Sequence, residues 1–314
     1  MTSREKLFFF IITFKFLVAN IVPLEFSFVP KINCNDLNKN GYPDFIVLSD
    51  IDYPQNIYHL ELKNNKIEIL WQYKKPDEEN GYFVDVLFND FNGDGKKELI
   101  ATAYQNDNKN IFYIFNTDSR SIKNTSPIIT KLKNTRFRIN NPLKLYHFQD
   151  DQSLFVLVQG SPNRKVILCQ YIDAQIVYKG ILAEDFINST KGPVHLALGD
   201  FDGLGNQDIF ILNNDFQPSG YFIFSNGFEE KINLDNYPRL KLLNSEGVDI
   251  NFDGKDDLVF INRNGDLMSN IWLDEAVSLS ERSIQNISVN AENGFIYLNT
   301  ISKSGKIGNY SIDP

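Results

Sequence analysis

An acidic, glycine-containing loop occurs four times in this chain and limits the folds open to it. The four copies read DLNKNGYPD at 36–44, DFNGDGKKE at 90–98, DFDGLGNQD at 200–208 and DINFDGKDD at 249–257. Apolar runs follow them directly, at 45–48, 99–101, 209–212 and 258–261. Short apolar runs bounded by turn residues are typical of strands covered on both faces. The repeated unit is therefore predicted to be a strand, an acidic loop and a second strand.

A fifth copy keeps the strands but not the loop. The run 143–148 reaches Asp150, the loop shrinks to 151–153, and the apolar pattern resumes at 154–157. Counted from the first acidic residue, the five copies start at 36, 90, 150, 200 and 249, so the spacing lies between 49 and 60 residues. That period suits one four-stranded blade.

The segments between the loops carry further hairpin patterns and no helical periodicity. One hairpin is predicted from 57–62 through Asn64 to 67–73. We therefore predict an all-β fold, a β-propeller of four-stranded antiparallel blades forming a single domain over 26–314. Five blades are favoured, and six or seven are the alternatives, because 294–314 remain as a hairpin that could begin a sixth blade or close the ring against the first.

The first 25 residues have a different character. Arg4 and Lys6 precede an apolar run from Leu7 to Leu24, interrupted by Lys15. This pattern predicts a signal peptide at 1–25, with an uncleaved anchor as the alternative. We expect a secreted, periplasmic or cell-surface protein, monomeric, with no stable membrane span after cleavage.

The loop has the form of a calcium site. Oxygens at positions one, three, five and nine converge when the chain turns at a glycine in position six, and Ca²⁺ takes six to eight oxygen ligands. The predicted metal ligands are Asp36, Asn38, Asn40, Asp44, Asp90, Asn92, Asp94, Glu98, Asp200, Asp202, Asp208, Asp249, Asn251, Asp253 and Asp257. We predict three to four structural Ca²⁺ ions.

The loops differ in how completely they match this form. An EF-hand requires a glutamate at position twelve, where these loops have Val47, Ala101, Ile211 and Phe260, so that motif is excluded. Leu204 fills position five of the loop 200–208, which makes it the weakest of the four. The copy at Asp150 should bind no ion.

DFNGDGKKELIATA and DINFDGKDDLVFIN resemble the FG-GAP or VCBS repeats of integrin α-subunits and of bacterial surface proteins. The resemblance implies a β-propeller that holds calcium between the first two strands of a blade and serves adhesion or recognition. The chain departs from the pattern at its Asp150 and Asp200 copies, and it lacks the FG-GAP tripeptide, so an integrin-like role is not implied.

Charge and composition favour a binding protein. The net charge of −9 repels phosphate backbones, so nucleic acid is not an expected partner. We expect a non-catalytic, calcium-binding module for a protein or glycan ligand. Trp71, Trp272 and tyrosines could line a sugar site, but core packing is the commoner role of aromatic residues. The alternative is a carbohydrate-active hydrolase or lyase, which would need two carboxylates converging in the central channel. Asp50, Asp85 and Glu246 are the candidates for that pair.

Overall fold

The protein is described by a computed structural model that is all-β in its described residues. Those residues are 17–23, 28–35, 37–42, 44–49, 55–64, 66–76, 81–105, 109–118, 121–122, 126–133, 143–148, 154–159, 166–183, 194–213, 219–234, 240–242, 247–249, 253–261, 267–269, 276–277, 284–292, 295–302 and 306–312. Of the predicted features, Asp36, Asn251, the Asp150 loop, Asp50, Glu246 and Trp272 lie outside them.

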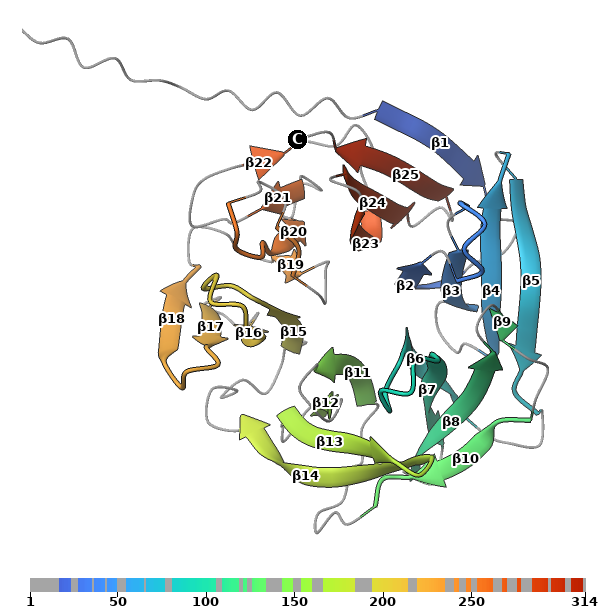
Figure 1. Ribbon diagram of the computed structural model, residues 1–314, viewed down its shortest axis with the longest axis horizontal. Helices are drawn as coiled ribbons and strands as arrows, with labels where there is room; N and C mark the ends of the chain where they lie inside the picture. Colours follow the sequence, from blue (N-terminus) through green and yellow to red (C-terminus); the bar gives the residue numbers. More distant parts are fainter. Residues whose placement is uncertain are drawn as a thin grey trace, which may run out of the picture.

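The described strands form six antiparallel sheets that stand around a ring (Figure 1), and the chain is a β-propeller. Three sheets come from the first part of the chain, with β9 (Ser121–Ile122) added beside β8: β2 (Phe28–Asn35), β3 (Asp44–Ser49), β4 (Asn56–Lys63), β5 (Lys66–Lys74); β6 (Tyr82–Asn89), β7 (Glu98–Gln105), β8 (Lys109–Asp118), β10 (Ile128–Lys131); β11 (Leu143–Phe148), β12 (Leu154–Gln159), β13 (Val166–Ile172), β14 (Gln175–Ala183).

Two further sheets follow in the same order along the chain, and the sixth combines both chain ends. Their strands are β15 (Val194–Gly199), β16 (Asp208–Asn213), β17 (Ser219–Ile223), β18 (Glu229–Asn233); β19 (Lys241–Leu242), β20 (Val259–Ile261), β21 (Leu267–Ser269), β22 (Ala276–Val277); β23 (Ile284–Glu292), β24 (Phe295–Ser302), β25 (Lys306–Ile312) and β1 (Leu17–Pro23). Below, the sheets are numbered one to six in this order.

The favoured count of five blades is wrong, because the sixth sheet is built without an acidic loop. β1 pairs with β25, with Leu17 opposite Ser311 and Pro23 opposite Lys306. Counting loops therefore overlooks a sheet whose strands come from the two ends of the sequence. β1 also lies inside the segment predicted as a signal peptide, so removal of that segment would take away the outer strand of this sheet.

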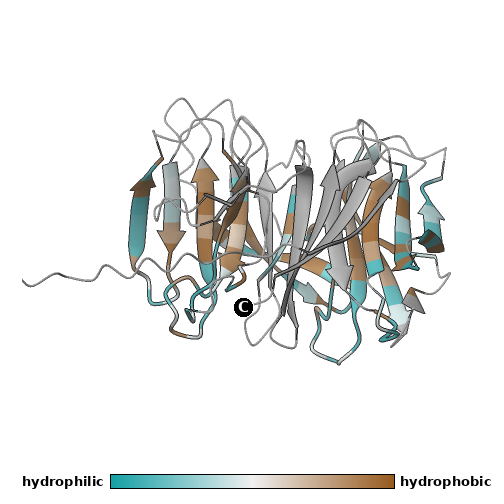
Figure 2. Ribbon diagram, turned by 90° about the horizontal axis from the view of Figure 1, so that it is seen from above, coloured by the Kyte–Doolittle hydropathy of each residue, from teal (hydrophilic) through white to brown (hydrophobic). Residues whose placement is uncertain are grey.

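The hydrophobic core lies between neighbouring sheets. Trp71 of the first sheet meets Phe115 of the second edge-on, with ring centroids 5.4 Å apart. The apolar runs that follow the acidic loops are buried as predicted, and Phe45 and Leu99 are both fully inaccessible. Seen from the side of the ring, hydrophobic residues gather on the inner strands, and many of the coloured loop residues along the lower edge are hydrophilic (Figure 2). Packing sheet against sheet buries the inner strands, whereas outer strands such as β5 and β18 are largely exposed.

Local turn chemistry sets the hairpins. Asn64 has φ 51° between β4 and β5, and Asp173 and Ala174 have φ 50° and 57° between β13 and β14. Positive φ at the centre of a two-residue turn matches the twist of the flanking strands. Cys169 on β13 is buried and free of any disulfide. None of the described segments is a helix with the length and apolarity needed to cross a bilayer.

Candidate metal-binding loops

The four acidic loops share one place in the architecture. The loops 36–44, 90–98 and 200–208 connect the first strand of a sheet to its second, and the loop 249–257 comes between β19 and β20. Since each sheet runs in the same order from its first strand, these connections lie at the same end of the ring. One face of the propeller therefore carries all four.

The glycine at position six turns the chain in every loop. Gly41, Gly95, Gly205 and Gly254 have φ values of 84°, 82°, 82° and 87°. No atom lies within 4 Å of the place where a Cβ would stand at any of these four, so the backbone angle alone requires glycine. The predicted role of the glycine is confirmed.

Loop 90–98 shows how the side chains close the turn. Asp90 accepts from the amides of Gly93 and Gly95 at 2.8 Å each, and Asn92 accepts from Asp94 N–H at 2.8 Å. Glu98 accepts from Phe91 N–H at 3.1 Å and from Asn92 Nδ2 at 3.0 Å. The carboxylates of Asp90 and Glu98 thus point back into the loop.

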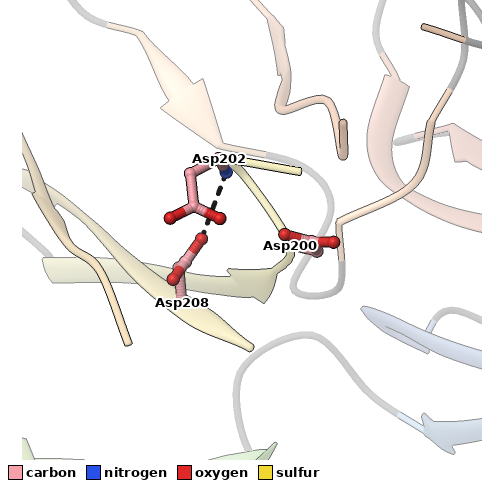
Figure 3. A group of neighbouring side chains, drawn as sticks. All are labelled: Asp200, Asp202 and Asp208. Atoms are coloured by element: carbon pink, nitrogen blue, oxygen red, sulfur yellow. Dashed lines mark hydrogen bonds between the residues drawn. The ribbon is translucent and has the colours of Figure 1, made fainter. Parts of the chain in front are cut away.

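Loop 200–208 brings three carboxylates together. Each of Asp200, Asp202 and Asp208 offers a carboxylate oxygen, and these atoms lie within 4.8 Å of one another. Figure 3 shows Asp202 and Asp208 facing each other, with Asp200 beside them. Asp208 accepts from Phe201 N–H at 2.9 Å, from Asp202 N–H at 3.3 Å and from Ser225 N–H at 2.8 Å. This cluster can hold a metal ion.

Carboxylates of these two loops have raised pKa values. Burial raises the pKa of Glu98 to about 7, and Asp94 and Asp90 add to the rise. Burial also raises the pKa of Asp208. Asp200 Oδ1 is buried and has no hydrogen-bond partner. A cation bound among these carboxylates would lower their pKa values, because a nearby opposite charge favours the ionised form. It would also give Asp200 Oδ1 a partner. The residues present therefore fit a hard cation.

Two side chains of loop 36–44 form hydrogen bonds with a residue from outside the motif. Asp44 accepts from Leu37 N–H at 2.7 Å, and Asn40 accepts from Tyr42 N–H at 2.9 Å. Asn38 and Asn40 donate through Nδ2 to Glu61 on β4, at 2.9 and 2.5 Å. Burial acts to raise the pKa of Glu61, but these two amides, with Lys63 and His59, outweigh it and the pKa is lowered.

Loop 249–257 keeps the same turn and contacts the loop before it. Asp249 accepts from the amides of Asp253 and Gly254, and Asp253 accepts from Lys255 N–H. Asp256 accepts from Asp200 N–H at 2.7 Å and donates its own backbone N–H to Asp200 O at 2.8 Å. Burial raises the pKa of Asp256, and Asp200 is among the acids that add to the rise. The two loops are therefore joined across neighbouring sheets.

Sequence reasoning missed three residues that organise this face: Glu61, Asp256 and Asn89. Asn89 Nδ2 lies 2.6 Å from His147 Nδ1 and so links β6 to β11. Glu61 and Asp256 fall outside the ligand positions of the motif. Strand pairing brings Glu61 to loop 36–44, and the packing of neighbouring sheets brings Asp256 to loop 200–208. A buried acid in an apolar strand pattern, as Glu61 is, was the one signal in the sequence.

Asp85, a candidate for the channel pair of an enzyme, lies in β6 and is 3% exposed. Its carboxylate accepts from Val86 N–H at 3.0 Å and from Leu145 N–H, on β11 of the next sheet, at 2.7 Å. The side chain therefore connects two sheets.

The sequence matches no known family profile, and it is similar to no curated protein. Many solved structures are alike in fold, and two of them contain BBS1N. BBS1N in complex with ARL6DN, from a crystal soaked with lead, has a TM-score of 0.55 and 10% identity, covering 95% of this chain and 97% of that chain. The same complex soaked with mercury gives a TM-score of 0.56 and 12% identity over the same shares. At this identity the likeness supports the propeller fold alone.

Proposed function

We propose that this protein is a non-catalytic propeller that binds another protein and holds Ca²⁺ in its acidic loops. The observation that carries the calcium part is the cluster of Asp200, Asp202 and Asp208, with ligand atoms within 4.8 Å of one another. Carboxylate and amide oxygens on a tight turn suit Ca²⁺. With four loops of this form, three to four ions are expected, and the chain would be a divergent FG-GAP or VCBS propeller.

A protein ligand is favoured over a glycan by the character of the exposed and buried side chains. Leu204 and Phe228 are 65% and 61% exposed, and the Ser225 amide connects the hairpin of Phe228 to the loop of Leu204 through Asp208. Contiguous exposed apolar patches are common where proteins bind proteins, and we propose that these two side chains belong to one such patch. Trp71 is 8% exposed and packs in the core, so it offers no platform for a sugar ring. BBS1N, similar in fold, was crystallised with a protein partner.

An enzyme is less well supported. Asp85 already serves two backbone amides, one of them in the next sheet. A carboxylate engaged in this way is poorly placed to protonate or attack a substrate. We also propose export to the cell surface or the medium, on the evidence of the apolar N-terminal run, with β1 retained because it pairs with β25.

Two measurements test this proposal. Calorimetric titration of the chelator-treated chain with CaCl₂ should detect three to four ions, with dissociation constants of roughly 10⁻⁴ to 10⁻³ M. The immobilised chain should capture a protein from the producing cells, or from cells in contact with them, in calcium but not in EDTA. The double variant L204S/F228S should not capture that protein. If the chain binds no calcium, the calcium part of the proposal is wrong. If it binds a glycan and no protein, the proposed protein ligand is wrong.

A further inference from the structure

We propose that the ion held by loop 200–208 controls the hairpin that carries Phe228, and thereby the apolar surface offered to the protein partner. This inference rests on the proposed function and deepens it, because it assigns the calcium dependence of partner binding to one loop of the four. The hairpin, at 224–228, joins β17 to β18 of the fourth sheet.

A hydrogen bond joins the acidic loop directly to this hairpin. Asp208, the ninth residue of the loop, accepts from Ser225 N–H through Oδ1 at 2.8 Å. Its Oδ2 accepts from Phe201 N–H and Asp202 N–H inside the loop, at 2.9 and 3.3 Å. One buried carboxylate therefore holds both the loop and the first residues of the hairpin. A shift of this carboxylate acts on both.

A row of phenylalanine side chains joins the same two segments a second time. Phe201 in the loop contacts Phe222 of β17, with ring centroids 5.4 Å apart. Phe222 stacks on Phe224 at 5.6 Å, and Phe224 stacks on Phe228 at 5.9 Å. The row leads from a ring that is 9% exposed to one that is 61% exposed. Close-packed side chains transmit strain, so the position of the loop also affects the Phe228 ring.

The hairpin has a defined conformation that these contacts can set. Phe224 N–H donates to Phe228 O, and Gly227 N–H donates to Phe224 O, both at 2.9 Å. Phe228 N–H donates to Asn226 Oδ1 at 2.8 Å, and Gly227 has φ 84°. These bonds fix Phe228 relative to Ser225, so the amide bound by the loop and the exposed ring move together.

An ion changes the forces that act on Asp208. Carboxylate oxygens of Asp200, Asp202 and Asp208 lie within 4.8 Å of one another, so the ionised groups repel unless a cation lies among them. Asp200 Oδ1 is also buried without a hydrogen-bond partner. An ion that binds the closed loop more tightly than an opened one shifts the equilibrium toward the closed loop. Chelation should therefore separate the acids and loosen the Ser225 contact.

Loop 90–98 is connected differently. Its ninth residue, Glu98, accepts from N–H groups of its own loop. Thr117, near the end of β8, donates its hydroxyl to Lys97 O, which is a backbone atom. The contact between this loop and the third strand of its sheet thus bypasses the acids. We therefore expect an ion in loop 90–98 to leave the Phe228 hairpin unchanged.

Hydrogen–deuterium exchange with mass spectrometry tests the inference on the unmodified chain. Calcium should slow exchange of a peptide containing 224–228 by at least about tenfold. The hairpin at 172–175 belongs to the third sheet, whose loop lacks the acidic motif, and there the change should stay below about twofold. A general effect of calcium on the fold would slow both peptides alike.

A matched pair of variants assigns the effect to one loop. D200N and D90N each remove the first acid, in loops 200–208 and 90–98 respectively. D200N should abolish the slowing at 224–228 and lower calcium-dependent capture of the partner by about tenfold. D90N should lose one ion in calorimetry and keep both the slowing and the capture.

Calorimetric calcium binding without slower exchange at 224–228, or with equal slowing at 172–175, overturns the inference and leaves the proposed function intact. So does a loss of the response in D90N as complete as in D200N. A wild type that binds no calcium overturns both proposals. If D200N does not fold, the comparison of the two wild-type peptides decides.

Discussion

Loops 90–98 and 200–208 have the same turn but satisfy their acids differently. In the first, Glu98 accepts from Phe91 N–H and from the amide of Asn92. In the second, Asp202 replaces the amide, and three carboxylates face one another with Asp200 Oδ1 unpartnered. The loop that matches the motif less well is thus the one that gathers three acids. A loop can therefore match more ligand positions of the motif without bringing its carboxylates closer together. How closely the carboxylates approach one another depends on which N–H groups donate to their oxygens.

The loops are also anchored differently to the neighbouring sheet. Asn89, the residue before loop 90–98, contacts the buried His147 of β11. Asp200 of the other loop donates to Asp256. One anchor depends on a neutral imidazole and the other on a carboxylate.

The largest effect should come from removing calcium. At tenfold excess over its dissociation constant, each ion stabilises the fold by about 1.4 kcal/mol, so EDTA should lower Tm by about 10 °C. In D200A and in D90A, the decrease in Tm caused by EDTA should be smaller by about the contribution of one calcium site. Differential scanning calorimetry with and without EDTA checks this. If D90A responds to EDTA as fully as the wild type, loop 90–98 holds no ion.

Next in size is the loss of the closing carboxylate. D208A leaves three backbone amides without their acceptor and should cost about 3 kcal/mol of unfolding free energy. E98A leaves one backbone amide and one side-chain amide and should cost less. Urea unfolding in EDTA separates these costs from metal binding. Equal losses in the two variants would mean that the extra hydrogen bonds of Asp208 contribute nothing.

The contact of His147 with Asn89, beside loop 90–98, predicts a pH dependence of the folding stability. Burial lowers the pKa of His147 to about 4. A histidine whose folded pKa lies below its unfolded value stabilises the protein fully above about pH 6.5, and the contribution falls as the pH drops toward 4. Between pH 7 and 5 the loss should be about 2 kcal/mol. H147Q should lack this part of the slope in urea titrations with EDTA, and an unchanged slope would assign the pH dependence to other groups.

The smallest expected effect comes from adding a carboxylate at position five of loop 200–208, where Leu204 offers no ligand. L204D places a carboxylate at position five of loop 200–208, where the leucine is 65% exposed, so no core contact is lost. The added charge should tighten calcium binding by about tenfold at that loop, and L204N should do less. Calorimetric titration measures it. If L204D leaves every affinity unchanged, position five does not face the ion.

The sequence by itself determined the local features of this protein. Its acids and glycines dictate turns with Gly95 or Gly205 in the left-handed region, and its apolar runs dictate buried strands. Both follow from interactions within about ten residues of chain. The four loops could be predicted for that reason, and their recurrence every 49 to 60 residues predicted the propeller.

Only the tertiary structure decided how many sheets there are and which residues meet at each loop. β1 joins β25 across nearly the whole chain, Glu61 reaches its loop through strand pairing, and Asp256 and Asp85 join neighbouring sheets. These contacts depend on register and on how sheets pack, and the sequence carries no local mark of either. The repeat predicts each unit, while the assembly of the ring sets the surroundings of each carboxylate.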